Sequence, residues 1–121
     1  MEQPLRRFKA EFFKALAHPG RIKMLEALRE GEKTVTELQA LLDDDEPSSA
    51  SQHLSILRMR GMVVGRKEGT SVYYSVRDPL LFDLLDFGRR IFNNQLSHTR
   101  DTLRSLDEDP PLAELAPAGR R

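Results

Sequence analysis

The side chains best suited to a chemical role lie between residues 47 and 60, Pro-Ser-Ser-Ala-Ser-Gln-His-Leu-Ser-Ile-Leu-Arg-Met-Arg. At about 100° per residue, Ala50, Leu54 and Leu57 fall on one side of a helix, a pattern typical of packing on a core. The opposite side carries hydroxyl, amide and guanidinium groups and no acid. Such groups can contact base edges and phosphates in the major groove of DNA. The residues predicted to make these contacts are Ser48, Ser49, Ser51, Gln52, His53, Ser55 and Arg58.

The pattern of this helix allows two other interpretations. A Ser-rich surface helix without a partner remains open. Catalysis by Ser51 with His53 is disfavoured, because side chains two residues apart on a helix point about 200° apart. No G-x-S-x-G turn surrounds them, and no base, nucleophile and orienting group converge elsewhere. We therefore expect the chain not to be an enzyme and to need no cofactor.

Composition narrows the protein class further. At 121 residues the chain is long enough for one domain with a core. No apolar run reaches 18 residues and no signal peptide opens the sequence, which predicts a soluble, cytoplasmic protein with no membrane partner. Cysteine is absent, which excludes disulfides and thiolate metal sites.

The distribution of charge matters more than its sum. The formal net charge is zero, which by itself argues against nucleic acid. Between residues 47 and 77, however, a single acid, Glu68, faces several bases, and the other acids lie elsewhere. A locally basic half can still bind DNA, with modest non-specific affinity. The bases are Arg58, Arg60, Arg66, Lys67 and Arg77.

Helices are predicted on the N-terminal side of this stretch. Apolar spacing indicates one over residues 4–17, a second from Pro19 to about Glu30, and a short third over 37–42 with Thr36 as its N-cap. Residues 43–46, Asp-Asp-Asp-Glu, are predicted to form a turn whose acids can cap the following helix. A divalent ion at this turn is disfavoured, because adjacent acids alternate in direction. Residues 36–60 thus have the pattern helix, turn, helix.

A β-hairpin is predicted after that pair. Strand-like runs at residues 62–64 and 72–76 enclose Glu68-Gly69-Thr70-Ser71, with glycine at the turn. A basic hairpin directly after a helix-turn-helix is a wing, able to touch phosphate or the minor groove. The residues assigned to this contact are Arg66, Lys67, Thr70 and Ser71.

A long final helix completes the pattern. Asp78 caps it, Pro79 starts it, and an apolar stripe continues to Leu106 over about 40 Å at 1.5 Å per residue. Covering the chain's own core is one role for this stripe; we favour dimerisation, because the apolar length exceeds one small domain. Residues 107–121 are expected to form a disordered tail beyond a domain of residues 1–106. The predicted dimer contacts are Leu5, Phe8, Phe12, Leu81, Leu85, Gly88, Phe92, Leu96 and Leu103.

The predicted fold is therefore mainly α with a small β-hairpin (α+β), a winged helix-turn-helix of about five helices. In this order, several motifs resemble the ArsR/SmtB family of bacterial winged-helix repressors, over about residues 5–106. The resemblance implies a homodimer, paired through its first and last helices, that binds an inverted-repeat operator and is released by an inducer. The motifs are Leu16-Ala-His-Pro-Gly-Arg21, Ser51-Gln-His-Leu54, Leu57…Gly61-Met-Val63 and Gly69…Val72-Tyr-Tyr74.

The metal sites of that family do not carry over to this chain. Many members sense metal through Cys-x-Cys before the recognition helix, where this chain has Gln39 and Leu41. Others bind ions on the last helix, at positions that correspond here to Asp78, Leu80, Ile91 and Asn94. His98 and Asp101 have a spacing that can hold a metal, but such a pair is more often a solvated helix contact. The turn at residues 43–46 is also about one residue longer than the family pattern. We therefore predict no metal site.

Two functions remain. The first is a DNA-binding transcriptional regulator, expected to be a homodimeric repressor, whose effector would be a small molecule, a protein or none. The second is a winged-helix module that binds protein through its Ser-rich face, favoured by the zero net charge.

Overall fold

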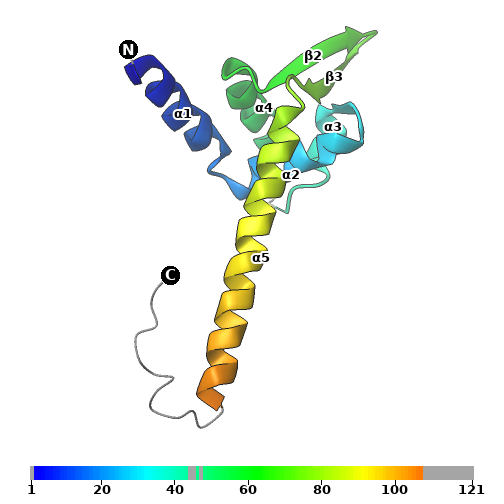
Figure 1. Cartoon of the computed structure of the whole chain (residues 1–121). Helices are drawn as coiled ribbons and strands as arrows, with labels where there is room; N and C mark the ends of the chain where they lie inside the picture. Colours follow the sequence, from blue (N-terminus) through cyan, green and yellow to red (C-terminus); the bar gives the residue numbers. More distant parts are fainter. Residues whose placement is uncertain (1, 44–45, 47, 108–121) are drawn as a thin grey trace. The chain divides into compact units, whose positions relative to one another are not determined.

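The computed structural model describes residues 2–43, 46 and 48–107. It confirms the predicted fold class, mainly helical with a winged hairpin (Figure 1). The predicted tail falls almost entirely on residues 108–121, which lie outside the described residues. None of the described helices is both long and apolar enough to cross a membrane. In chain order the elements are α1 (Glu2–Leu16), α2 (Pro19–Ala27), the 3-10 helix η1 (Leu28–Glu30), β1 (Lys33–Thr34), α3 (Val35–Gln39), α4 (Ser49–Met59), β2 (Val63–Glu68), β3 (Ser71–Val76) and α5 (Leu80–Asp107).

The chain divides into two compact units, Met1–Asp83 and Leu84–Arg121. The first holds every element from α1 to the first turn of α5. Its core is aliphatic and confirms the predicted inward stripe of α4, since Ala50 and Leu57 are fully buried and Leu54 is nearly so. This burial gives α4 a fixed inner side and therefore a defined outer side. The fully buried large side chains of the core are Met24, Leu25, Leu38, Leu57 and Val63.

The predicted hairpin is present, but the sheet has a third strand that the sequence analysis did not foresee. The strand order is β1-β3-β2, with both pairs antiparallel. β1 pairs Lys33 with Tyr74 and Thr34 with Tyr73. Two residues are too few for an alternating pattern to be visible, which is why this strand was missed. The hairpin turns at Gly69, whose φ of 64° is a left-handed conformation that glycine adopts without steric cost.

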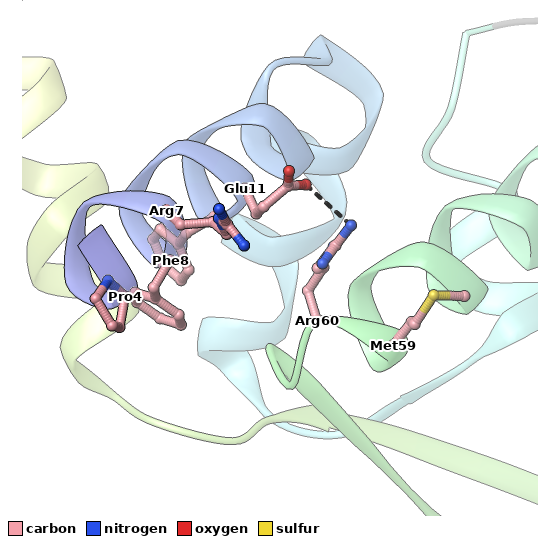
Figure 2. Close-up of a pocket in the computed structure, with 7 residues that line it drawn as sticks. Pro4, Arg7, Phe8, Glu11, Met59 and Arg60 are labelled. Atoms are coloured by element: carbon pink, nitrogen blue, oxygen red, sulfur yellow. Dashed lines mark ion pairs between the residues drawn. The ribbon is translucent and has the colours of Figure 1, made fainter. Parts of the chain in front are cut away.

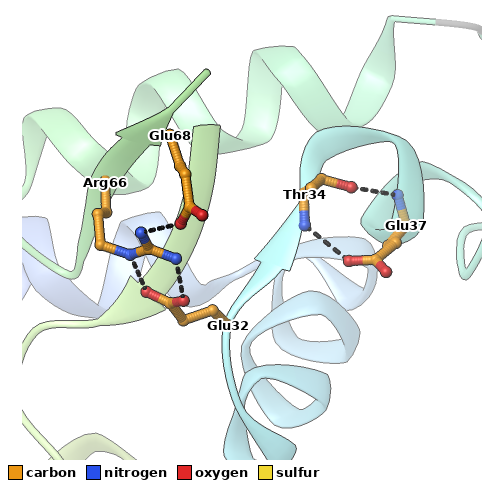
Figure 3. A network of polar contacts seen from close by, with 5 residues as sticks. All are labelled: Glu32, Thr34, Glu37, Arg66 and Glu68. Atoms are coloured by element: carbon orange, nitrogen blue, oxygen red, sulfur yellow. Dashed lines mark hydrogen bonds and ion pairs between the residues drawn. The ribbon is translucent and has the colours of Figure 1, made fainter. Parts of the chain in front are cut away.

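The N-cap predicted at Thr36 was wrong, and the third helix is shorter than predicted. Thr34 caps α3 instead: its Oγ1 accepts from the Glu37 backbone N–H at 3.2 Å, and its own N–H donates to Glu37 Oε1 at 2.9 Å (Figure 3). This reciprocal capping box needs Glu or Gln three residues after the cap, and Glu37 stands in that position relative to Thr34. The helix ends at Gln39, beyond which the Leu41 and Leu42 amides bond only three residues back.

Side chains also begin the second and last helices. His18 Nδ1 accepts from the Gly20 N–H at 3.0 Å and caps α2. Asp78 Oδ1 accepts from the Leu80 N–H at 3.0 Å, as predicted, although α5 starts at Leu80 and not at Pro79. Arg29 donates to the Phe82 carbonyl oxygen at 3.0 Å and lies over its ring at 5.1 Å. The first turn of α5 is thereby fixed to η1.

We expect Thr34→Ala to lower the free energy of unfolding by about 1 kcal/mol, the usual cost of removing a helix N-cap. The matched control is Thr36→Ala, which removes the same hydroxyl from an exposed site without a capping bond and should cost less than about 0.5 kcal/mol. Urea unfolding of both variants measures the difference. A larger loss from Thr36→Ala would contradict the assignment of the cap.

Candidate nucleic-acid interface

Helix α4 presents one continuous exposed stripe. Ser51, Gln52, Ser55 and Arg58 are all exposed, and Ser48, just before the helix, is exposed as well. Gln52 Nε2 donates to Ser48 Oγ at 3.2 Å, so the two side chains lie together on this surface. The stripe holds no acid and stands opposite the buried Ala50, Leu54 and Leu57. It offers hydrogen-bonding groups of the kind that read base edges in a major groove.

Two residues expected on this surface are buried. Ser49 retains 6% of its exposure and His53 retains 8%, so neither is available for a base or a phosphate in this conformation. Ser49 accepts from Gln39 Nε2 at 3.2 Å. His53 Nδ1 accepts from Arg21 Nε at 3.2 Å. This burial disagrees with the predicted DNA contacts of both residues. Helix periodicity alone does not indicate it, because a hydroxyl or an imidazole can find hydrogen-bond partners inside the fold.

Gln39 positions the start of α4, a role that the sequence analysis missed. Its Oε1 accepts from the Ala50 N–H at 2.9 Å, and its Nε2 donates to the Glu46 carbonyl at 3.2 Å. The first turn of a helix has unpaired N–H groups, and here a side chain from α3 satisfies one of them. The predicted capping by turn acids is not observed for Asp43, which pairs with Lys23 at 3.5 Å, and Ser48 makes no side-chain cap. Residues 44 and 45 lie outside the described part of the chain.

His18 and His53 lie at the junction between α2 and α4. The rings of His18 and His53 lie 4.4 Å apart between centroids. A Cβ on Gly20 would come within 3.2 Å of His53 Nε2, so glycine permits the close approach of the two helices there. Arg21 bonds to His53 and also donates to the Ala15 carbonyl at 3.1 Å. These residues support the position of α4 from within the fold.

The hairpin β2–β3 projects beside α4 as a wing (Figure 1). Lys67 and Thr70 are exposed, and Ser71 is half-buried. Lys67 has no acidic partner among the described residues, and the same holds for Arg58 and Arg77. These three cations keep their charge available to a polyanion.

Arg66 was expected to contact DNA, but in the structure it is paired with two acids. Its guanidinium makes two hydrogen bonds to Glu32, at 2.7 and 2.9 Å, and another to Glu68 (Figure 3). It also lies 5.0 Å from the centre of the Tyr73 ring. These bonds from Arg66 hold the pKa of Glu32 below its usual range, and the two acids raise the pKa of Arg66. With two acids beside it, Arg66 braces the wing against the segment before β1, and a phosphate contact is no longer its simplest role.

The residues predicted for dimerisation fall into two sets. Leu81 is 6% exposed and belongs to the core of the first unit, so a dimer contact through it disagrees with the structure. Phe12 and Leu85 are half-buried, and Gly88 is exposed. Large apolar side chains that the sequence analysis did not select are also exposed, at Phe13, Phe87 and Ile91. The predicted residues with more than half of their surface exposed are Leu5, Phe8, Phe92, Leu96 and Leu103.

The positions that would correspond to family metal sites do not offer a ligand set. The amide of Gln39 is used by the start of α4, and Asp78 caps α5. Asp101 lies within 4.0 Å of Arg104, its neighbour one turn along α5. Among the described residues there is no group of three or more His, Asp or Glu side chains that could hold an ion.

Comparison with known proteins agrees with this geometry. The model of the bacterial regulatory protein arsR family matches residues 18–64, from the cap of α2 into β2. An HTH-type transcriptional regulator of Mycobacterium tuberculosis, Rv0081, is 40% identical over 86% of this chain and 91% of its own. Its crystal structure superposes with a TM-score of 0.68, at 42% identity, over 79% of this chain and 96% of that one.

Two further relatives extend the comparison. The homodimeric winged helix-turn-helix DNA-binding domain Mb0332 of Mycobacterium bovis has a TM-score of 0.71 at 28% identity, over 80% of this chain and 89% of that one. A probable mercury resistance operon repressor of Streptomyces lividans is 40% identical over 66% of this chain and 63% of its own. The relatives are transcriptional regulators, in agreement with the prediction of a regulator and not an enzyme. The family model matches residues 18–64, and Rv0081 is 40% identical over 86% of this chain. This chain therefore belongs to the arsR family of bacterial regulatory proteins.

Proposed function

We propose that the chain is a homodimeric transcriptional repressor that places α4 in the major groove of an inverted-repeat operator. The observation that carries the proposal is the acid-free exposed stripe of α4, held in place by the buried stripe opposite it. Gln52 is the central side chain of that stripe and carries both a donor and an acceptor. On this view it reads bases, and its serine neighbours contact bases or phosphates.

The wing supplies charge in this proposal. Lys67 and Thr70 are its exposed polar residues, and Lys67 has no acidic partner among the described residues. A lysine on a mobile stem neutralises phosphate without reading sequence. Arg66, paired with Glu32 and Glu68, holds the hairpin in place.

The proposal of a homodimer rests on the exposed apolar surface of α5 and on the relative Mb0332, which is described as homodimeric. In the second unit, Phe92, Leu96 and Leu103 each expose more than half of their surface. Isolated chains rarely leave so much apolar surface to water along one helix. Two copies of α5 can bury this surface against each other.

A protein-interaction module is the second candidate. The net charge of zero and the two acids around Arg66 favour it, since both weaken the attraction of a polyanion. The Ser-rich stripe of α4 would then contact a polypeptide. The DNA-binding experiment that follows separates the two candidates.

We expect Gln52→Ala to weaken operator binding by about 1–3 kcal/mol and to leave binding to scrambled DNA nearly unchanged, because it removes a base contact. Lys67→Ala should weaken both equally and reduce the slope of log affinity against log salt by about one unit per dimer arm. Fluorescence anisotropy over a salt series, with the DNA upstream of the chain's own gene and a scrambled duplex, gives both quantities.

The control for this experiment is Lys9→Ala, which removes the same charge from the exposed surface of α1. It should leave both affinities and the salt slope unchanged. Identical profiles for Gln52→Ala and Lys67→Ala would contradict the division between a reading helix and a charged wing. Absence of salt-dependent binding by the unaltered protein would favour the protein-interaction module.

The dimer is expected to dissociate in the variant Phe92→Asp, because an unpaired carboxylate in an apolar interface costs several kcal/mol. Light scattering should then report a monomer. Ser97→Asp places the same carboxylate on the polar side of α5 and should leave the dimer intact. A Phe92→Asp protein that remains dimeric would place the interface elsewhere.

Metal ions are expected to have little effect on operator binding, since the residues at the family metal positions lack a ligand set. Zinc, cadmium or arsenite at roughly micromolar levels should change the affinity by no more than about threefold, or roughly 0.65 kcal/mol. The reference is the same protein after dialysis against a chelator. A tenfold release of the operator by any of these ions would overturn the expectation.

A further inference from the structure

One hollow in the first unit, between α1 and the end of α4, belongs to the surface proposed for the dimer. It encloses about 350 Å³ and is lined by Glu11 and Arg60, which form an ion pair at 3.0 Å (Figure 2). Phe8 and Phe12 also line it, and both are among the predicted dimer contacts. A partner chain therefore covers this hollow in the proposed homodimer.

A second hollow in the same unit lies between the start of α3 and the outer half of the hairpin. It encloses about 270 Å³, slightly below the usual range for small-molecule sites of about 300–1,000 Å³. None of the predicted dimer contacts lines it. Its lining side chains are uncharged, and most of them carry a hydroxyl group. The lining residues are Thr34, Val35, Thr36, Thr70, Ser71, Val72 and Tyr74.

Most of these hydroxyl groups can bind a ligand. Thr34 Oγ1 is already used, because it accepts from the Glu37 N–H and caps α3 (Figure 3). Among the described residues, the hydroxyl groups of Thr36, Thr70 and Tyr74 have no hydrogen-bond partner. Thr36 and Thr70 are exposed. Tyr74 is half-buried, but no described side chain has a buried polar atom without a partner, so its hydroxyl group reaches solvent.

Gly65 lets the Tyr74 ring lie across the neighbouring strand. The two residues are paired in the register of β2 and β3, so they share one face of the hairpin. A Cβ on Gly65 would come within 3.0 Å of Val72 Cγ1 and 3.2 Å of Tyr74 Cε1. A larger residue would displace the Tyr74 ring, and glycine therefore keeps Tyr74 at the edge of the hollow.

Lys67 places a cation on the same face of the hairpin. It is paired with Val72, which lines the hollow, so the two side chains extend from one face. Lys67 is exposed and has no acidic partner among the described residues. Arg66 lies on the opposite face, at 5.0 Å from the centre of the Tyr73 ring, where two acids hold it. The face of the hollow thus combines hydroxyl donors with an available positive charge.

We propose that this hollow binds one phosphate group of the operator backbone. The hydroxyl groups of Thr36, Thr70 and Tyr74 donate hydrogen bonds to its oxygens, and Lys67 neutralises its charge from the neighbouring strand. Threonine and tyrosine are regular partners of phosphate oxygens in protein–DNA complexes, where they fix the register of the protein and carry no sequence information. This inference rests on the proposed function and names the residues that position the chain on the duplex.

The place of the hollow in the fold fits the path of a DNA strand. α3 and α4 are the two helices of the helix-turn-helix, and the first of them crosses the backbone when the second enters the major groove. The hairpin follows α4 and reaches the adjacent minor groove. The backbone between these grooves passes the hollow, which is lined by both α3 and the hairpin. A phosphate bound there joins the wing to the helix-turn-helix.

Tyr74→Phe is the test variant, since it removes only the hydroxyl group. It should weaken binding to the DNA upstream of the chain's own gene and to a scrambled duplex by the same factor, about five- to tenfold, because one hydrogen bond to a phosphate is lost. The slope of log affinity against log salt should stay unchanged, because no cation is removed. Thr36→Val should give the same result. Fluorescence anisotropy over a salt series measures all of these quantities.

Tyr73→Phe is the matched control. It removes the same hydroxyl group from the adjacent residue of β3, on the opposite face, where the ring lies beside Arg66. It should leave both affinities and the salt slope unchanged. Circular dichroism verifies that each variant is folded. Equal losses for Tyr73→Phe and Tyr74→Phe would overturn the proposed phosphate site, and so would an unchanged affinity in Tyr74→Phe.

Phosphate ethylation interference locates the contact on the DNA. Ethylation neutralises one phosphate at a time, and in each half-site it should weaken binding of the unaltered protein at a defined set of phosphates. Tyr74→Phe should become insensitive to ethylation at one of them, and Thr36→Val should become insensitive at the same one. Effects at different phosphates would contradict the binding of a single group between α3 and the hairpin.

Two comparisons separate the remaining outcomes. If the unaltered protein binds neither duplex, the proposed function and the phosphate site fail together; if it binds and Tyr74→Phe binds equally well, only the phosphate site fails. Free inorganic phosphate at constant ionic strength should change the melting temperatures of the unaltered protein and Tyr74→Phe equally. A larger rise for the unaltered protein, with equal DNA affinities, would assign the hollow to a free phosphate and overturn the backbone contact.

Discussion

The position of α4 depends on one constraint: its inner side must be buried while its first backbone N–H groups still find partners. Ala50, Leu54 and Leu57 satisfy the first condition by packing in the core. The amide of Gln39 satisfies part of the second, because it accepts from the Ala50 N–H at 2.9 Å. An unpaired buried N–H costs about as much as a lost hydrogen bond. Apolar burial therefore sets which side of α4 faces outward, and one polar side chain from α3 fixes where the helix starts.

Some cations of this fold are held in ion pairs, and others keep an exposed charge. Arg66 is held by Glu32 and Glu68, and Arg60 is held by Glu11. Exposed ion pairs of this kind contribute little to stability, typically below about 1 kcal/mol each. Their larger effect is on position, because the Arg66–Glu32 and Arg60–Glu11 pairs join elements that are distant in sequence. The arginines that orient the wing and the end of α4 are therefore poor candidates for phosphate contacts, and Lys67 and Arg58 are better ones.

The exposed apolar residues are also divided. Along the 28 residues of α5, Phe92, Leu96 and Leu103 remain exposed in the second unit of the chain. In the first unit, Phe8 and Met59 are exposed beside a set of cations. A contiguous exposed apolar surface favours burial against a like surface.

The local sequence pattern by itself determined much of the secondary structure of this protein and which side of α4 is buried. The i, i+4, i+7 spacing of Ala50, Leu54 and Leu57 predicted the buried side of α4, and Gly69 predicted the hairpin turn, because both depend on neighbours within a few residues. Only the tertiary structure decided which polar residues stay outside. His53 is buried against Arg21, and Arg66 is bound to Glu32, which lies 34 residues away in sequence. Helical periodicity fixes the direction of a side chain relative to its own helix, whereas its partner comes from another element, and chain folding alone brings the two together.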